Sequence, residues 1–138
     1  MSRIANAPRF SLSLLAGHRI TELIGATESD IDDLIEMLFI RIDDATDWHR
    51  VFLQAGIGFW ENMSKQDAFS EFEDLRQIDF ADRWGIRGAS LLSAECIGGT
   101  WEDSVLSQFE FVLSLGTVRL NFADLTDMDS DSMITFEP

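Results

Sequence analysis

One stretch of fifteen residues most constrains what this chain can fold into. Between residues 108 and 122, apolar and polar residues alternate on both sides of Gly116, apart from Val112. The apolar positions of this alternation are Phe109, Phe111, Leu113, Val118, Leu120 and Phe122. Such alternation is typical of strands with one buried and one solvent-exposed face, and a glycine supplies the positive φ of a tight turn. The stretch therefore predicts a β-hairpin that turns at Gly116.

A similar order of segments recurs along the chain. The expected strands are residues 19–24, 34–42, 48–54, 89–97, 105–115, 117–123 and 133–136. Two halves, about 17–60 and 88–136, each run glycine, strand, polar loop, strand, turn, strand. A divergent duplication would produce this pattern, and so would two unrelated β-meanders, because only a few apolar positions and a glycine coincide.

Some segments are compatible with either a strand or a helix. Residues 34–42 are nearly continuously apolar and predict a central strand, although part of the segment also fits a helical period. Residues 10–16 are compatible with a short strand or a short helix. In the insert 61–87 between the halves, residues 67–75 predict one short helix, with Ser64 as its N-cap.

The expected architecture is a single domain over residues 1–138. We predict an α+β fold, a mainly antiparallel sheet built from two meander-like halves with one short helix; the alternative is an all-β sandwich or open barrel. The length suits one domain, and 46% apolar residues exclude disorder for most of the chain. No apolar run is long enough to cross a bilayer. We interpret the N-terminus as uncleaved and the protein as cytoplasmic, in agreement with the single Cys96, which we expect to be buried.

The charge of the chain limits its partners. Twenty-five acidic residues against ten basic residues give a net charge of −15 and a pI near 4.2. This magnitude exceeds the value of about 2–8 that serves solubility in a small domain. A negative field repels nucleic acids and anionic membranes and attracts basic surfaces. We therefore expect a basic protein partner, with no binding to nucleic acid or membrane.

Two acidic segments that each contain a tryptophan are the candidate partner-binding sites. The candidate residues are Asp43, Asp44, Asp47 and Trp48 in the first segment and Trp101, Glu102 and Asp103 in the second. An indole surrounded by carboxylates can anchor a basic partner at an interface. Packing in the core is the other role open to each tryptophan.

A third acidic segment resembles part of a calcium-binding loop. Asp127, Asp129 and Asp131 match positions 1, 3 and 5 of an EF-hand loop. The match fails at position 6, where Ser132 replaces glycine, and the glutamate falls one place early, at Glu137. We expect a solvated acidic loop that does not bind calcium tightly.

The sequence nominates no catalytic centre. His18 and His49 lie in different segments without ligand spacing, and the many paired carboxylates single out no acid–base pair. The chain contains no phosphate-binding glycine loop followed by lysine, no G-x-S-x-G, no H-E-x-x-H and no C-x-x-C. We therefore predict a protein that is not an enzyme and that needs no cofactor.

These observations favour a non-enzymatic acidic binding or inhibitor protein. In size, acidity and lack of catalytic motifs the chain resembles the small immunity proteins that bacteria make against nucleases and other toxins. This resemblance of type implies a basic toxin domain as the partner and carries over no residues. The alternatives are an accessory or structural domain, and thirdly an enzyme of unknown class. A monomer is expected, or a homodimer formed through an exposed strand edge.

Overall fold

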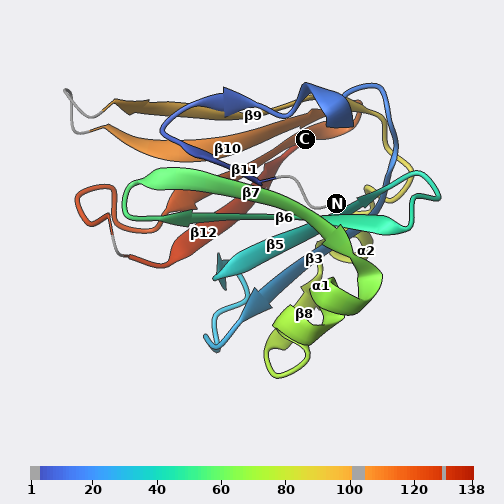
Figure 1. The fold of residues 1–138 in the computed structure, drawn as a ribbon, viewed down its shortest axis with the longest axis horizontal. Helices are drawn as coiled ribbons and strands as arrows, with labels where there is room; N and C mark the ends of the chain where they lie inside the picture. Colours follow the sequence, from blue (N-terminus) through green and yellow to red (C-terminus); the bar gives the residue numbers. More distant parts are fainter. Residues whose placement is uncertain (1–3, 101–104, 129) are drawn as a thin grey trace.

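The fold consists of two antiparallel β-sheets with two short helices (Figure 1). The computed structural model describes residues 4–100, 105–128 and 130–138. Of these residues, 57% lie in strands and 12% in helices. The prediction of a mainly antiparallel β-fold is therefore confirmed. No helix in the described ranges is long and apolar enough to span a membrane.

Each sheet has six strands, and each half of the chain supplies four neighbouring strands of one sheet. Sheet A contains, in spatial order, β1 (Ile4–Ala7), β7 (Ile57–Ser64), β6 (Asp47–Gln54), β5 (Met37–Ile42), β3 (Ile20–Thr27) and β8 (Arg76–Asp79). Sheet B contains β2 (Phe10–Ser11), β9 (Leu91–Thr100), β10 (Val105–Leu113), β11 (Gly116–Phe122), β12 (Ser132–Glu137) and β4 (Leu34–Ile35). Two independent meanders would give the same arrangement, so the duplication is not confirmed.

The hairpin predicted around Gly116 is present as β10 and β11. Phe111 lies opposite Val118 in the register, and all six apolar positions of the alternation are buried. The turn itself falls on Ser114 and Leu115, and Gly116 begins β11 with φ +150°. A Cβ at Gly116 would lie 2.5 Å from the carbonyl oxygen of Glu137 on β12. The glycine is therefore needed for the approach of β12 as well as for its own backbone conformation.

The prediction of one continuous strand over residues 34–42 is wrong. The segment is divided at Glu36 into β4, which pairs with β12 of sheet B, and β5, which pairs with β3 and β6 of sheet A. The backbone N–H of Glu36 donates to the carbonyl of Ala26, and its side chain is exposed. A continuous apolar run has the same sequence pattern whether it lies in one sheet or passes from one sheet to another. The pattern could therefore not show the break at Glu36.

The helices lie between β7 and β9. α1 (Lys65–Phe72) begins at Ser64, whose hydroxyl accepts the Asp67 N–H at 3.1 Å, as predicted for this N-cap. A second helix, α2 (Phe80–Arg83), and the strand β8 follow it, whereas one helix was expected. The predicted insert 61–87 also starts too early, because β7 continues to Ser64.

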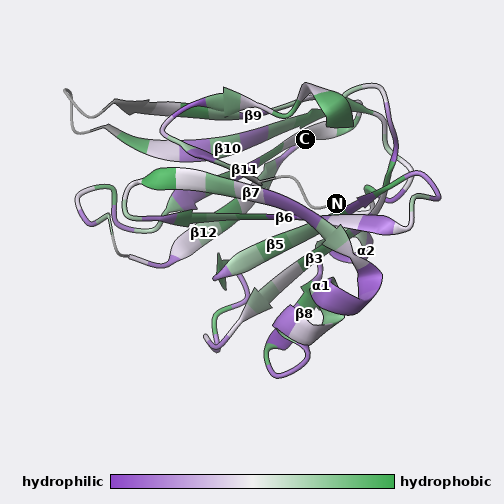
Figure 2. Ribbon diagram, viewed as in Figure 1, coloured by the Kyte–Doolittle hydropathy of each residue, from purple (hydrophilic) through white to green (hydrophobic). Residues whose placement is uncertain are grey.

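The main core lies between the two sheets. Buried apolar residues of both sheets meet there, among them Val51 of β6, Phe111 of β10 and Leu120 of β11. The β5–β6 turn carries hydrophilic residues (Figure 2). The sheets approach closely at Gly58 of β7, where a Cβ would lie 2.5 Å from Cys96 Sγ of β9 and 3.0 Å from Phe109 Cζ of β10. This spacing explains why glycine, a poor strand former, occupies the second position of β7 in sheet A.

A second, smaller core lies on the opposite face of sheet A, under α1. Phe72 of α1 packs edge-on against Phe39 of β5, with ring centroids 4.7 Å apart, and against Trp48 of β6 at 6.5 Å. Ala68 and Met63 complete the contact. Helix α1 therefore covers only part of this face, and the uncovered part borders the groove described below.

Replacement of Gly58 by alanine tests the close approach of the sheets. We expect Gly58→Ala to lower the free energy of unfolding by about 2 kcal/mol, because the new methyl group overlaps Cys96 Sγ. In the Cys96→Ala background, part of this loss should disappear, since the overlapping sulfur is gone. Chemical denaturation of the four proteins measures the coupling, and strictly additive losses would contradict the proposed contact.

Candidate binding groove

A groove of about 950 Å³ runs beside α1 across the outer face of sheet A. Its lining comes from five neighbouring strands, the β5–β6 turn, the helix and Glu73 directly after it. The lining residues are Glu22, Ile24, Arg41, Ala45, Thr46, Asp47, Trp48, Ser64, Lys65, Gln66, Phe69, Phe72, Glu73 and Gln77. This volume lies at the upper end of the range typical of ligand sites.

Aromatic side chains form the apolar part of the groove. Trp48 and Phe69 pack edge-on with ring centroids 5.9 Å apart, and Phe69 also contacts Phe72 at 5.1 Å. Phe69 is 40% exposed, whereas Trp48 is only 4% exposed. The ammonium of Lys65, the first residue of α1, lies 5.3 Å from the centre of the Phe69 ring. Phe69 is therefore the aromatic residue of the groove that a partner can cover directly.

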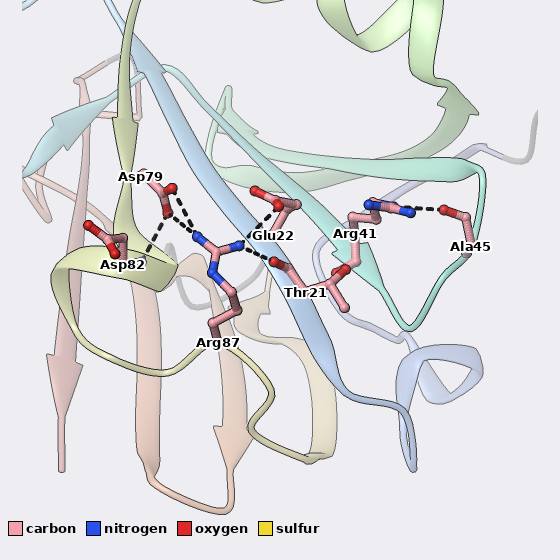
Figure 3. A network of polar contacts seen from close by, with 7 residues as sticks. All are labelled: Thr21, Glu22, Arg41, Ala45, Asp79, Asp82 and Arg87. Carbon is pink, nitrogen blue, oxygen red and sulfur yellow. Dashed lines mark hydrogen bonds and ion pairs between the residues drawn. The ribbon is translucent and has the colours of Figure 1, made fainter.

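Arg41 brings a positive charge into the groove without a carboxylate partner. Its Nε donates to the carbonyl oxygen of Ala45 at 2.8 Å, and no hydrogen bond joins its terminal nitrogens to another described residue. Glu22, which lies opposite Arg41 in the β3–β5 register, is directed instead toward Arg87, at 2.9 Å (Figure 3). Arg87 also binds Asp79 at 3.0 Å. The charge of Glu22 is thus compensated from outside the groove, and the four N–H donors of the two terminal nitrogens of Arg41 remain available.

The β5–β6 turn divides its acidic residues into one structural and two free carboxylates. Asp43 accepts the backbone N–H of Arg19 at 2.9 Å and contacts His18 Nδ1 at 2.5 Å. The Arg19 N–H, followed by His18, lowers the pKa of Asp43. Asp44 and Asp47 are exposed and form no ion pair with a described residue. Only these two carboxylates of the turn are available to a partner.

The structure brings part of the predicted site together. Asp47 and Trp48 both line the groove, and Trp48 has the other role that the sequence left open, because it is a buried member of the second core. Its indole N–H is buried without an acceptor in the described part of the chain. The other predicted group, Trp101, Glu102 and Asp103, lies outside the described residues.

Sequence reasoning missed most of the residues that line the groove. The missed residues include Arg41 of β5, Phe69 of α1 and Glu73, which directly follows α1. Only the docking of α1 on sheet A brings them together. The pattern of Phe69 and Phe72 at a step of three indicated an apolar helix face. The pattern could not show that Phe72 is buried whereas Phe69 stays 40% exposed.

The acidic residues near the C-terminus lie in a loop of successive turns. Asp124 accepts two hydrogen bonds from Thr126, which lower the pKa of its carboxyl group, and Ser130 N–H donates to the carbonyl of Asp127. Asp129, the central member of the EF-hand-like triplet, lies outside the described residues. No group of three potential ligand side chains suited to a metal ion occurs in the described ranges. The prediction on calcium binding stays a prediction.

A second acidic surface surrounds Glu36, between β4 and β5. Burial raises the pKa of Glu36, and the charges of Glu28 and Asp131 raise it further. Asp30 and Asp33 lie in the same exposed segment. Negative charge therefore gathers at a second place, and none of these residues lines the groove, so any test of the groove must separate the two surfaces.

His49 and Cys96 are both buried in the main core. His49 Nδ1 accepts the Trp60 indole N–H at 3.1 Å, and burial lowers the pKa of His49 to about 4. Burial likewise raises the pKa of the Cys96 thiol to about 11, which leaves no thiolate near neutral pH. Neither residue lines the groove.

Comparisons of the chain with models of protein families, with curated proteins and with solved structures return no match. The function is therefore argued from the chain itself. What the groove offers is an aromatic surface, the ammonium of Lys65, the guanidinium of Arg41 with no carboxylate partner among the described residues, and exposed carboxylates at both ends of its lining.

Truncation of Trp48 and of Phe69 tests which of the two side chains stabilises the core and which serves mainly as surface. We expect Trp48→Ala to lower the free energy of unfolding by about 3–5 kcal/mol, as for other buried tryptophans. Phe69→Ala, at a position that is 40% exposed, should cost clearly less. Urea denaturation followed by far-UV circular dichroism measures both losses. Equal losses for the two variants would contradict the division of roles.

His49 should make the protein less stable in acid. The neutral ring is favoured in the folded state, so the unfolded chain binds a proton first as the pH falls from about 6.5 to about 4. Over this window the wild type should lose up to about 3 kcal/mol relative to His49→Gln, which keeps an acceptor for Trp60 but does not titrate. Denaturation at a series of pH values measures the difference, and parallel curves for the two proteins would refute this account.

Proposed function

We propose that this chain is a non-enzymatic binding protein of the immunity or inhibitor type, which docks on a basic protein partner through the acidic surface around the groove. The observation that carries the proposal is the distribution of charge. Basic residues are few and mostly engaged within the molecule, whereas Asp47 and Glu73 at the groove are exposed and form no ion pair with a described residue.

The arginines are used mainly to stabilise the fold. Five of the eight arginines in the described ranges form ion pairs with carboxylates of other segments: Arg50, Arg76, Arg83, Arg87 and Arg119. Asp32, for example, receives both Arg76 and Arg83, the latter at 2.6 Å, and these bonds lower its pKa. Because these arginines are paired within the molecule, few positive charges remain to offset the unpaired carboxylates of the surface.

The carboxylates that remain around the groove are placed to attract a cationic surface. Asp47 and Glu73 line the groove and are exposed, and Asp44 lies next to Ala45 in the same turn. None of the three forms an ion pair with a described residue. Charges of one sign concentrated beside an aromatic surface favour fast association with a basic partner and provide apolar area for the bound state.

Two other functions were considered for the same chain. An accessory or structural role would need no partner for the groove, and its acidic residues would serve solubility alone. An enzyme would need activated groups at the groove, but the histidine and thiol with strongly shifted pKa values are buried elsewhere. The exposed carboxylates at the groove favour the binding protein over both.

Charge reversal at the groove tests the proposal. A basic partner is first isolated by affinity capture and identified, and its association with the purified chain is followed by stopped-flow fluorescence at several salt concentrations. We expect the association rate to fall as salt rises, and Asp44→Lys with Asp47→Lys to lower it by about tenfold, with little change in dissociation. Asp43 is left intact because it binds Arg19 and His18.

The matched control carries the same change in net charge at the second acidic surface. Asp30→Lys with Asp33→Lys should lower the association rate much less than the pair of substitutions at the groove. Equal effects of the two pairs would mean that only the net charge matters. Failure to capture any basic protein above the level of a bait-free control would refute the proposed function.

A further inference from the structure

We infer that the groove beside α1 receives an extended segment of the basic partner, four or five residues long, with a basic side chain at each end and an apolar side chain between them. This inference rests on the proposed function and adds the form and chemistry of the partner's contact. It follows from the length of the groove, the charges at its ends and the donors at its centre.

The length of the groove matches a short extended peptide. From Asp47 to Gln77 the groove crosses β6, β5, β3 and β8, which are consecutive strands of sheet A, and Ser64 at the end of β7 borders its start. Four strands at their usual spacing span about 15 Å, and an extended chain covers that distance with four or five residues. Helix α1 runs in the same direction, because Ser64 at its start lies opposite Asp47 of β6, and Phe72 at its end accepts a hydrogen bond from Gln77 of β8.

The two ends of the groove carry carboxylates that are free to bind cations. Asp47 lies at the β6 end, and Glu73, directly after α1, lies at the β8 end. Both are exposed and form no ion pair with a described residue. A segment with a basic residue at each end would place one cation at each carboxylate.

The centre of the groove favours an apolar side chain and a carbonyl oxygen. Phe69 and Ile24 offer apolar surface, and the terminal nitrogens of Arg41 lack acceptors among the described residues. The ammonium of Lys65, 5.3 Å from the centre of the Phe69 ring, adds a second positive charge here. The guanidinium repels a basic side chain at this point and can donate to a backbone carbonyl of the bound segment. The negative charges at the ends and the positive charges at the centre therefore direct the basic residues of the segment to the ends and its apolar residue to the centre.

A small carboxylic acid is the competing occupant, because Arg41 could also bind a carboxylate. It would have to approach a protein of net charge −15 and lie between Asp47 and Glu73. The extended basic segment satisfies the same donors and also pairs the two carboxylates. Charge complementarity thus favours the segment.

The test uses a capped pentapeptide with arginine at both ends, leucine in the centre and alanine between them, and the whole chain labelled with ¹⁵N. We expect saturable binding that shifts the backbone signals of the groove and the side-chain N–H signal of Arg41. Glu73→Gln should weaken binding about fivefold, through loss of one ion pair at the groove. The matched control, Asp74→Asn, makes the same change of charge one residue away at an exposed position that does not line the groove, and should leave the affinity nearly unchanged.

The possible results separate this inference from the proposed function. Equal weakening by Glu73→Gln and Asp74→Asn, equal binding of a peptide with glutamate in place of arginine, or no measurable binding would each overturn the inference about the groove. Saturable binding of benzoate at Arg41, without binding of the peptide, would also overturn it and assign the groove to a small acid. In all these cases the proposed function stands if the captured basic partner still associates in a salt-dependent manner.

Discussion

The packing of one face of sheet A against one face of sheet B is the contact on which the other features of this molecule depend. It requires inward apolar residues at every second position, and a glycine at position 58 where Cys96 and Phe109 leave no room for a Cβ. With the apolar residues directed inward, the turns and the outer face of sheet A can carry charge. The groove exists because α1, only eight residues long, covers part of that outer face.

Local alternation was enough to predict the hairpin of β10 and β11 and the turn after β5, because each signal lies within about fifteen residues. The break at Glu36 and the burial of Trp48 could not be predicted in this way. Both depend on segments that are distant in sequence: β12 pairs with β4, and α1 covers Trp48. The groove was also missed, because its lining comes from segments that are distant in sequence. Asp47 and Trp48 were predicted as site residues only because a carboxylate and an indole are neighbours in the sequence.

The acidic residues of the chain do not all have the same role. Asp43 and Asp32 accept hydrogen bonds that hold separate segments together, and their lowered pKa values show that the ionised form is favoured. Glu36 shows the opposite, because burial and neighbouring carboxylates disfavour its charge. Carboxylates of the first kind stabilise the fold, and those of the second kind gain from any cation that approaches. A count of acidic residues in the sequence cannot separate the two kinds.

Cys96 gives the molecule an internal indicator of how its two layers come apart. It is the only cysteine of the chain, it lies between the sheets beside Gly58, and its raised pKa keeps the thiol unreactive while the layers stay together. Alkylation of this thiol can proceed only when β7 and β9 separate, so the rate of labelling follows the frequency of that opening. A partner bound on the outer face of sheet A would slow the labelling without touching the sulfur, to the extent that it holds the two layers closed.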